Sequence, residues 1–129
     1  MATSREIAGD IGTLLAEHRG GAVVLLDIAI QSGWTDWFVI ATATSTTHLR
    51  GLAKAVDGYV SERKLSVRGG SSIKDDEEWV LLDMGDVVIH LMSERARAFY
   101  ELEKLWFQAE ATTISAPQAP QELQAPRLA

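Results

Sequence analysis

Hydrophobic positions recur along this chain with two different periods, and each period predicts one kind of element. Near the start, apolar residues spaced three and four apart predict a helix from about Arg5 to Arg19. Thr3 and Glu6 stand where a capping box would begin this helix, and Gly20-Gly21 would end it. The same spacing predicts a second helix from about His48 to Arg63. The apolar stripes are Ile7, Ile11, Leu14 and Leu15 in the first helix, and Leu49, Leu52, Ala53, Val56 and Val60 in the second.

Uninterrupted apolar runs predict strands that are covered on both faces. Two such runs span Ala22–Asp27 and Asp36–Ala43, with a loop or bent connection between them. The later run EWVLLDMGDVVIHLM divides into two strands at Met84-Gly85-Asp86, because glycine accepts positive φ and suits a hairpin turn. The segment Ser66–Gly70 allows a further short edge strand. The order of elements predicts an α/β fold, in which flanking helices pack on a mixed sheet.

The last expected helix begins after Ser93, which can cap it, and runs to about Phe107. Tyr100 lies beside Glu101 and is turned by about 100° from Phe99 around the helix, so it should be at least partly exposed. Three other residues fall on one face of a continuous helix and are assigned to the core. They are Phe99, Leu102 and Trp106.

Composition changes near the end of the chain, where all three prolines lie in an Ala/Gln/Pro-rich stretch without hydrophobic period. We therefore expect one folded domain over residues 1–110 and a disordered tail over residues 111–129. The chain has no cysteine, which excludes disulfides and thiolate metal sites. No apolar run approaches the roughly 18 residues of a membrane helix, and the start lacks the layout of a signal peptide. A cytoplasmic protein without membrane contact is expected.

Acidic residues gather in one part of the sequence. Between Asp75 and Glu103 there are nine carboxylates and two arginines, which gives −7, whereas the whole chain carries −6. A nucleic-acid binder needs a basic surface that displaces counterions from phosphates. This region should instead meet a basic partner, such as a ribosomal protein, a histone or a polyamine, and no direct DNA contact is expected.

Asp83, Asp86 and His90 are the residues that could form a metal site with catalytic function. Asp86 and His90 share one strand face, but four residues of strand separate them by roughly 13 Å. Asp83 lies across the turn. The alternative interpretation is that the aspartates shape the turn and that His90 is a half-buried structural histidine.

Two other segments suggest anion binding more weakly. Gly69–Ser72 resembles a phosphate loop, but it leads into acidic residues that would repel phosphate. Thr44–Thr47 precede a helix, where capping explains the hydroxyls equally well. His18 and His48 lack neighbours at metal-ligand spacing and are interpreted as surface residues.

Trp79 directly follows four acidic residues and stands in step with Leu81 and Asp83 along its strand. An exposed tryptophan beside carboxylates is typical of a hot spot that meets a basic partner. A core position for Trp79 is the alternative, and the residue pattern alone leaves both open.

Three stretches of the sequence together resemble one protein family. They are TDWFVIATATS (Thr35–Ser45), WVLLDMGDVVIH (Trp79–His90) and FYELEKLW (Phe99–Trp106). In this order and spacing they are similar to the ribosomal silencing factor family, also called Iojap-related proteins. The resemblance runs from the first helix to about Trp106 and does not include the tail.

The resemblance implies a fold related to nucleotidyltransferases, without their activity and without a cofactor. Catalysis in that superfamily needs a Gly-Ser motif and an Asp-x-Asp pair that holds magnesium. Here Asp83 and Asp86 are three apart across a turn, so the pair is absent. The alternative is a metal-dependent enzyme of that fold that uses Asp83, Asp86 and His90.

The resemblance also implies a function as a translation repressor that is not an enzyme. Members of the family bind the large ribosomal subunit through its fourteenth protein, which is basic, and block a bridge to the small subunit. Carried over by motif position, Trp79 and Tyr100 match the aromatic contacts. Homodimers through the same surface are a further expectation. The expected neighbours at the contact are Leu82, Asp83, Asp86 and Glu101.

Overall fold

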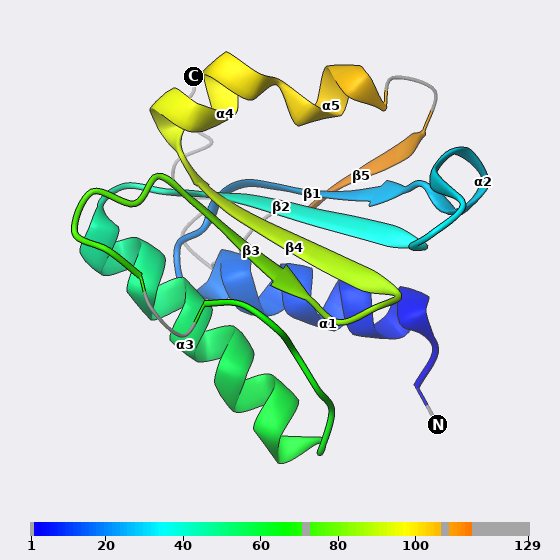
Figure 1. Ribbon diagram of the computed structural model, residues 1–129. Helices are drawn as coiled ribbons and strands as arrows, with labels where there is room; N and C mark the ends of the chain where they lie inside the picture. The colour runs from blue at the N-terminus through cyan, green and yellow to red at the C-terminus, as the bar shows by residue number, and fades with distance from the viewer. Residues whose placement is uncertain (1, 71–72, 107–108, 115–129) are drawn as a thin grey trace, which may run out of the picture.

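A five-stranded sheet separates two layers of helices (Figure 1). The computed structural model describes residues 2–70, 73–106 and 109–114. This mixed sheet with flanking helices confirms the predicted α/β fold class. In chain order the elements are α1 (Ser4–Glu17), β1 (Gly21–Asp27), α2 (Ala29–Ser32), β2 (Trp37–Ala43), α3 (Thr46–Glu62), β3 (Trp79–Asp83), β4 (Val87–Ser93), α4 (Glu94–Tyr100), α5 (Leu102–Leu105) and β5 (Glu110–Ile114).

The strands lie in the order β3-β4-β2-β1-β5. β2 and β4 run parallel at the centre, and the other neighbouring pairs are antiparallel. A parallel pair needs a crossover connection, which α3 and β3 provide. The predicted hairpin between β3 and β4 is confirmed, with Gly85 at φ 91°. Its turn is fastened to β2, because the carbonyl of Asp86 accepts hydrogen bonds from the N–H groups of Asp36 and Trp37 at 3.1 and 3.0 Å.

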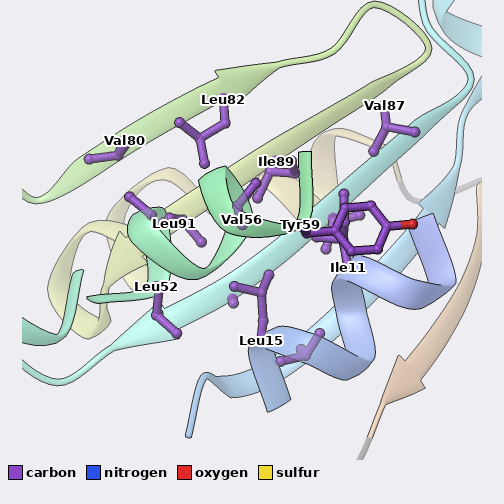
Figure 2. Packing of buried hydrophobic residues seen from close by; sticks show 14 of the residues in the cluster. Ile11, Leu15, Leu52, Val56, Tyr59, Val80, Leu82, Val87, Ile89 and Leu91 are labelled. Atoms are coloured by element: carbon purple, nitrogen blue, oxygen red, sulfur yellow. The ribbon is translucent and has the colours of Figure 1, made fainter. Parts of the chain in front are cut away.

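The first core lies between the sheet and the helices α1 and α3 (Figure 2). Ile11 and Leu15 of α1 and Leu52 and Val56 of α3 are all buried there, as the predicted stripes required. The predicted caps are also present: Thr3 Oγ1 accepts from the N–H of Glu6 at 3.1 Å within a full capping box. These two helices therefore start and pack where local sequence places them.

The second core lies on the opposite face of the sheet, beneath α4 and α5 (Figure 1). α4 and α5 have only seven and four residues, so they cover less of the sheet than α1 and α3 do. Arg97 fastens this layer, since its guanidinium donates to the Glu103 carboxylate at 2.7 Å and to the Thr42 hydroxyl at 2.9 Å. The buried members of this core are Leu26, Ile28, Phe38, Ile40, Val88, Met92, Ala96 and Leu102.

The expectation of one continuous last helix is wrong. α4 ends at Tyr100, because Glu101 adopts the left-handed conformation with φ 47° and ψ 55°. Residues before and after the break therefore no longer share one helix face: Leu102 is buried, whereas Phe99 is 77% exposed. The assignment of Phe99 to the core is therefore corrected, and Trp106 is only partly buried. The expected end of the helix at Phe107 lies outside the described residues.

The expected end of the folded domain also changes. Residues 110–114 form β5, which pairs antiparallel with β1 and places Glu110 opposite Asp27 and Ile114 opposite Val23. The expectation of disorder is thus wrong for residues 111–114, and residues 115–129 lie outside the described part. The edge strand expected at Ser66–Gly70 is reduced to a single bridge between Arg68 and Asp83. Within the described ranges, no helix has the length and apolar character that crossing a membrane requires.

Candidate functional site

Alternation along β3 decides which of its side chains can meet a partner. Val80 and Leu82 point toward α3 and the first core (Figure 2). Leu82 is only 3% exposed, so the expectation that it borders the contact surface is corrected. Trp79 and Leu81 point to the opposite face, where Leu81 is 45% exposed. The apolar neighbour of Trp79 at the surface is therefore Leu81, because adjacent strand residues face opposite sides.

The end of α4 brings two further aromatic side chains beside Trp79. Tyr100 is 49% exposed, and its ring centroid lies 4.7 Å from that of Trp79. Phe99 meets Tyr100 edge to face with 4.9 Å between the ring centroids. Both distances suit favourable aromatic pairs. Trp79 itself is partly buried, so the core and surface interpretations of this residue each hold in part.

These rings form one wall of an open groove of about 390 Å³. We call it the aromatic groove. Glu78 is held in place there, since the Ser93 hydroxyl donates to its carboxylate at 2.9 Å. In the described part of the chain, no ion pair involves Glu77 or Glu78, so their charges remain available. The groove is lined by Glu77, Glu78, Trp79, Arg95, Ala96, Phe99 and Tyr100.

His90 lies in the middle of β4, the strand next to the edge strand β3, and contacts Trp79 of the aromatic groove. It is 3% exposed and packs against Phe38, with 4.4 Å between the ring centroids. Its Nδ1 accepts a hydrogen bond of 3.1 Å from the indole N–H of Trp79. Desolvation by burial lowers the pKa of His90 from 6.5 to about 4, so the ring is neutral at pH 7. The expectation of a half-buried histidine is close, although burial is nearly complete.

The structure does not bring the predicted acidic residues to the aromatic groove. Asp83 lies at the far end of β3, roughly 13 Å along the strand from Trp79. Its carboxylate accepts from the N–H of Gly85 at 2.8 Å, as expected for a turn-shaping aspartate. Asp86 is exposed within that turn. Glu101 directly follows Tyr100, and its carboxylate forms an ion pair with Lys104 at 3.2 Å. Of the three acidic residues expected at the contact, it is therefore the one that lies beside an aromatic contact residue.

The alternative metal site at Asp83, Asp86 and His90 gains no geometric support. Among the residues that the structure describes, no group of three or more His, Asp or Glu side chains could hold a metal ion. His90 is buried and already bound to Trp79 through Nδ1. Asp83 is committed to the turn and to an ion pair with Arg68 at 3.9 Å.

The hydroxyl-rich segment before α3 acts as a cap. Ser45 accepts from the N–H of His48 at 3.0 Å, and the Thr46 hydroxyl donates to the carbonyl of Asp75 at 2.9 Å. His48 in turn bonds to Thr44 and, through Nε2, to the carbonyl of His18 at 2.9 Å. The Ser45 and Thr46 hydroxyls therefore already have protein partners, which favours the capping interpretation over anion binding.

Sequence reasoning missed Leu81 and Phe99 as surface residues. The signal for Leu81 was present, because it shares strand parity with Trp79. Phe99 could not be found in this way, since its exposure depends on the helix break at Glu101.

The chain is similar over most of its length to proteins of known family. The family model described as "Ribosomal silencing factor during starvation" matches residues 1–128. A ribosomal silencing factor from Treponema pallidum is 33% identical over 102 residues, which cover 77% of this chain and 88% of that protein. The mouse protein named mitochondrial assembly of ribosomal large subunit protein 1 is 32% identical over 119 residues, covering 85% of this chain and 51% of the mouse protein. A crystal structure of a protein from Chromobacterium violaceum has a TM-score of 0.74 and 25% identity, covering 92% of this chain and 98% of that one.

Proposed function

Because this chain belongs to the family of ribosomal silencing factors, we propose that it represses translation by occupying the large ribosomal subunit. In this proposal the aromatic groove docks on a basic protein of that subunit, and the bound chain prevents the small subunit from joining. The bound chain acts by steric occupancy, so no covalent bond is made or broken. The name of the mouse relative, which refers to assembly of the large subunit, agrees with this partner.

The observation that carries the proposal is the cluster of exposed aromatic rings beside carboxylates that form no ion pair among the described residues. Tyr100 and Phe99 present large apolar rings to solvent, although most large apolar residues in the described part of the chain are buried. Tyrosine and tryptophan anchors supply much of the binding energy of protein interfaces. Glu77 and Glu78 supply a negative rim, which complements a basic partner and disfavours nucleic acid.

Arg95 also lines the groove, so two glutamates and one arginine give it a net charge of −1. Further carboxylates nevertheless lie next to it, because Asp76 and Glu94 line an adjoining groove together with Glu77, Glu78 and Arg95. A partner with several lysines or arginines therefore meets a predominantly acidic face.

The resemblance found in the sequence points to the fourteenth protein of the large subunit as that basic partner. The proposal accordingly places the protein in the cytoplasm, where free subunits are found. It also includes self-association through the aromatic groove, since a face that buries aromatic rings against one partner can bury them against a second copy.

Co-sedimentation with separated ribosomal subunits tests the proposal. Trp79→Ala and Tyr100→Ala should each weaken binding to the large subunit by at least about 2 kcal/mol, or roughly thirtyfold, because they remove anchoring rings. Ile30→Ala is the matched control, since Ile30 is a large apolar residue on α2, 93% exposed and outside the groove.

Circular dichroism should confirm that each variant is folded, which matters most for Trp79 because it also packs on the second core. Normal binding by folded Tyr100→Ala would rule out the groove as the contact. No binding by the wild type, or equal binding to both subunits, would refute the silencing function itself.

A further inference from the structure

His90 is a buried polar residue that has no role in the function proposed above. It stands on β4 opposite Leu81 of β3 and beside Ile40 of β2, on the sheet face that carries the second core. The surrounding buried residues of that core are apolar. Its hydrogen bond to the Trp79 indole links this interior position to the wall of the aromatic groove.

The geometry fixes the protonation of the His90 ring. An indole N–H can only donate a hydrogen bond, so Nδ1 of His90 must be the acceptor and the proton must sit on Nε2. Within the described residues, Nε2 is buried and has no hydrogen-bond partner. A buried donor without a partner costs free energy. An apolar residue of similar size would avoid that cost, but it would leave the indole N–H without an acceptor.

The Trp79 indole needs such an acceptor to keep one orientation. Trp79 is the first residue of β3, an edge strand, and is only partly buried at the margin of the second core. Its ring centroid lies 4.7 Å from that of Tyr100, a side chain that is itself half exposed. Side-chain packing therefore restrains the indole on some sides only, and the bond to His90 fixes the rotation that packing leaves free.

We propose that His90 is a positioning residue of the aromatic groove: its Nδ1 holds the Trp79 indole in the orientation that packs against Tyr100 and faces the basic partner. This inference rests on the proposed function, because it explains how the same groove is kept ready to bind. A ring fixed before association loses less side-chain entropy when the complex forms.

Three substitutions separate positioning from simple core packing. His90→Asn keeps an acceptor near the position of Nδ1, His90→Gln moves the acceptor outward toward the position of Nε2, and His90→Leu removes it. We expect His90→Asn to bind the large subunit within twofold of the wild type. We expect His90→Leu and His90→Gln to bind at least fivefold more weakly.

The indole N–H resonance of Trp79 gives a readout that is independent of the ribosome. The chain has four tryptophans, and this signal is the one lost in Trp79→Phe. In the wild type and in His90→Asn it should exchange slowly with water, and in His90→Leu it should exchange at least tenfold faster. In the Trp79→Phe background, which has no indole donor, His90→Leu should add less than twofold to the loss of binding.

Equal binding by the asparagine, glutamine and leucine variants would overturn the inference, as would an equal effect of His90→Leu in both backgrounds. If His90→Leu does not fold, the comparison of His90→Asn with His90→Gln decides in the same way. Absence of large-subunit binding by the wild type would overturn the proposed function together with this inference. Wild-type binding that survives in His90→Leu would overturn the inference alone.

Discussion

Burial of His90 couples the stability of the fold to pH. In the folded protein its pKa is lowered from 6.5 to about 4 by desolvation, so folding favours the neutral ring. Between these two values the unfolded chain binds a proton that the folded chain does not bind. The contribution to stability is therefore complete above about pH 6.5 and is lost as the pH falls toward 4.

We predict that protonation of His90 lowers the unfolding free energy by roughly 3 kcal/mol as the pH falls from 6.5 to 4, at about 1.4 kcal/mol per pH unit. Urea unfolding of the wild type and His90→Asn at several pH values measures it. Carboxylates also titrate in this range, so the difference between the two proteins is the relevant quantity. A difference that does not change with pH would contradict the prediction.

Tyr59 is a second residue whose surroundings shift its pKa, but this shift does not change its charge at neutral pH. Burial and a hydrogen bond of 2.9 Å donated to Asp10 raise its pKa to about 12. The bond joins α3 to α1 beneath the sheet. It shows how a polar group on a buried stripe is satisfied at the edge of the first core.

At the scale of elements, α4 is a short helix whose position decides whether the aromatic groove exists. It carries Phe99 and Tyr100 at its end and is held by Arg97, whose side chain is 11% exposed. Besides Glu103 and Thr42, Arg97 donates to the carbonyl of Gly21 at 3.3 Å. One side chain thus joins α4 to the ends of β1 and β2 and to α5.

We predict that Arg97→Ala lowers the unfolding free energy by about 2 kcal/mol, because charge-assisted hydrogen bonds are lost and Glu103 is left without its partner. It should also weaken large-subunit binding, since α4 is released. Arg95→Ala is the control for stability, because Arg95 is exposed on the same helix and should change it by less than about 0.5 kcal/mol. Equal unfolding midpoints for the two variants would disprove this account.

β5 is a second element whose contribution to the unfolding free energy can be measured. It covers the edge of β1 and places Ile114 against the first core. A chain that ends at Ile114 should be as stable as the full chain, within about 0.5 kcal/mol. A chain that ends at Ala109 should lose roughly 2 kcal/mol, since several backbone hydrogen bonds at about 1 kcal/mol each are only partly offset by regained chain entropy. Thermal unfolding of both shortened chains measures this, and identical midpoints would show that β5 adds nothing.

At the scale of the whole molecule, the acidic segment between Asp75 and Glu103 also carries the aromatic rings that line the groove. Complementary charges raise the rate of encounter and are screened by salt. We predict that affinity for the large subunit falls several-fold between 50 and 300 mM salt. In the double variant Glu77→Gln, Glu78→Gln this dependence should be weaker. Affinity that is independent of salt would speak against a basic partner.

Much of this molecule follows from local sequence. The caps at Thr3 and Ser45, the two amphipathic helices and the hairpin at Gly85 were predictable, because each depends on residues within a turn or two of one another. The acidic segment and the order of the motifs also lie in the sequence, and with them the family. Even the exposure of Leu81 follows from its parity with Trp79 once the strand is known.

Tertiary structure decided the details of the groove. The break at Glu101 and the exposure of Phe99 occur where Arg97 holds α4 to distant strands, and no local pattern predicts a left-handed residue there. β5 exists because β1 offers a free edge, not because its own sequence is apolar. The bond between Trp79 and His90 joins residues eleven apart that only the pairing of β3 with β4 makes neighbours. Contacts between remote segments depend on how the whole chain packs, and that is why they could not be predicted from periodicity.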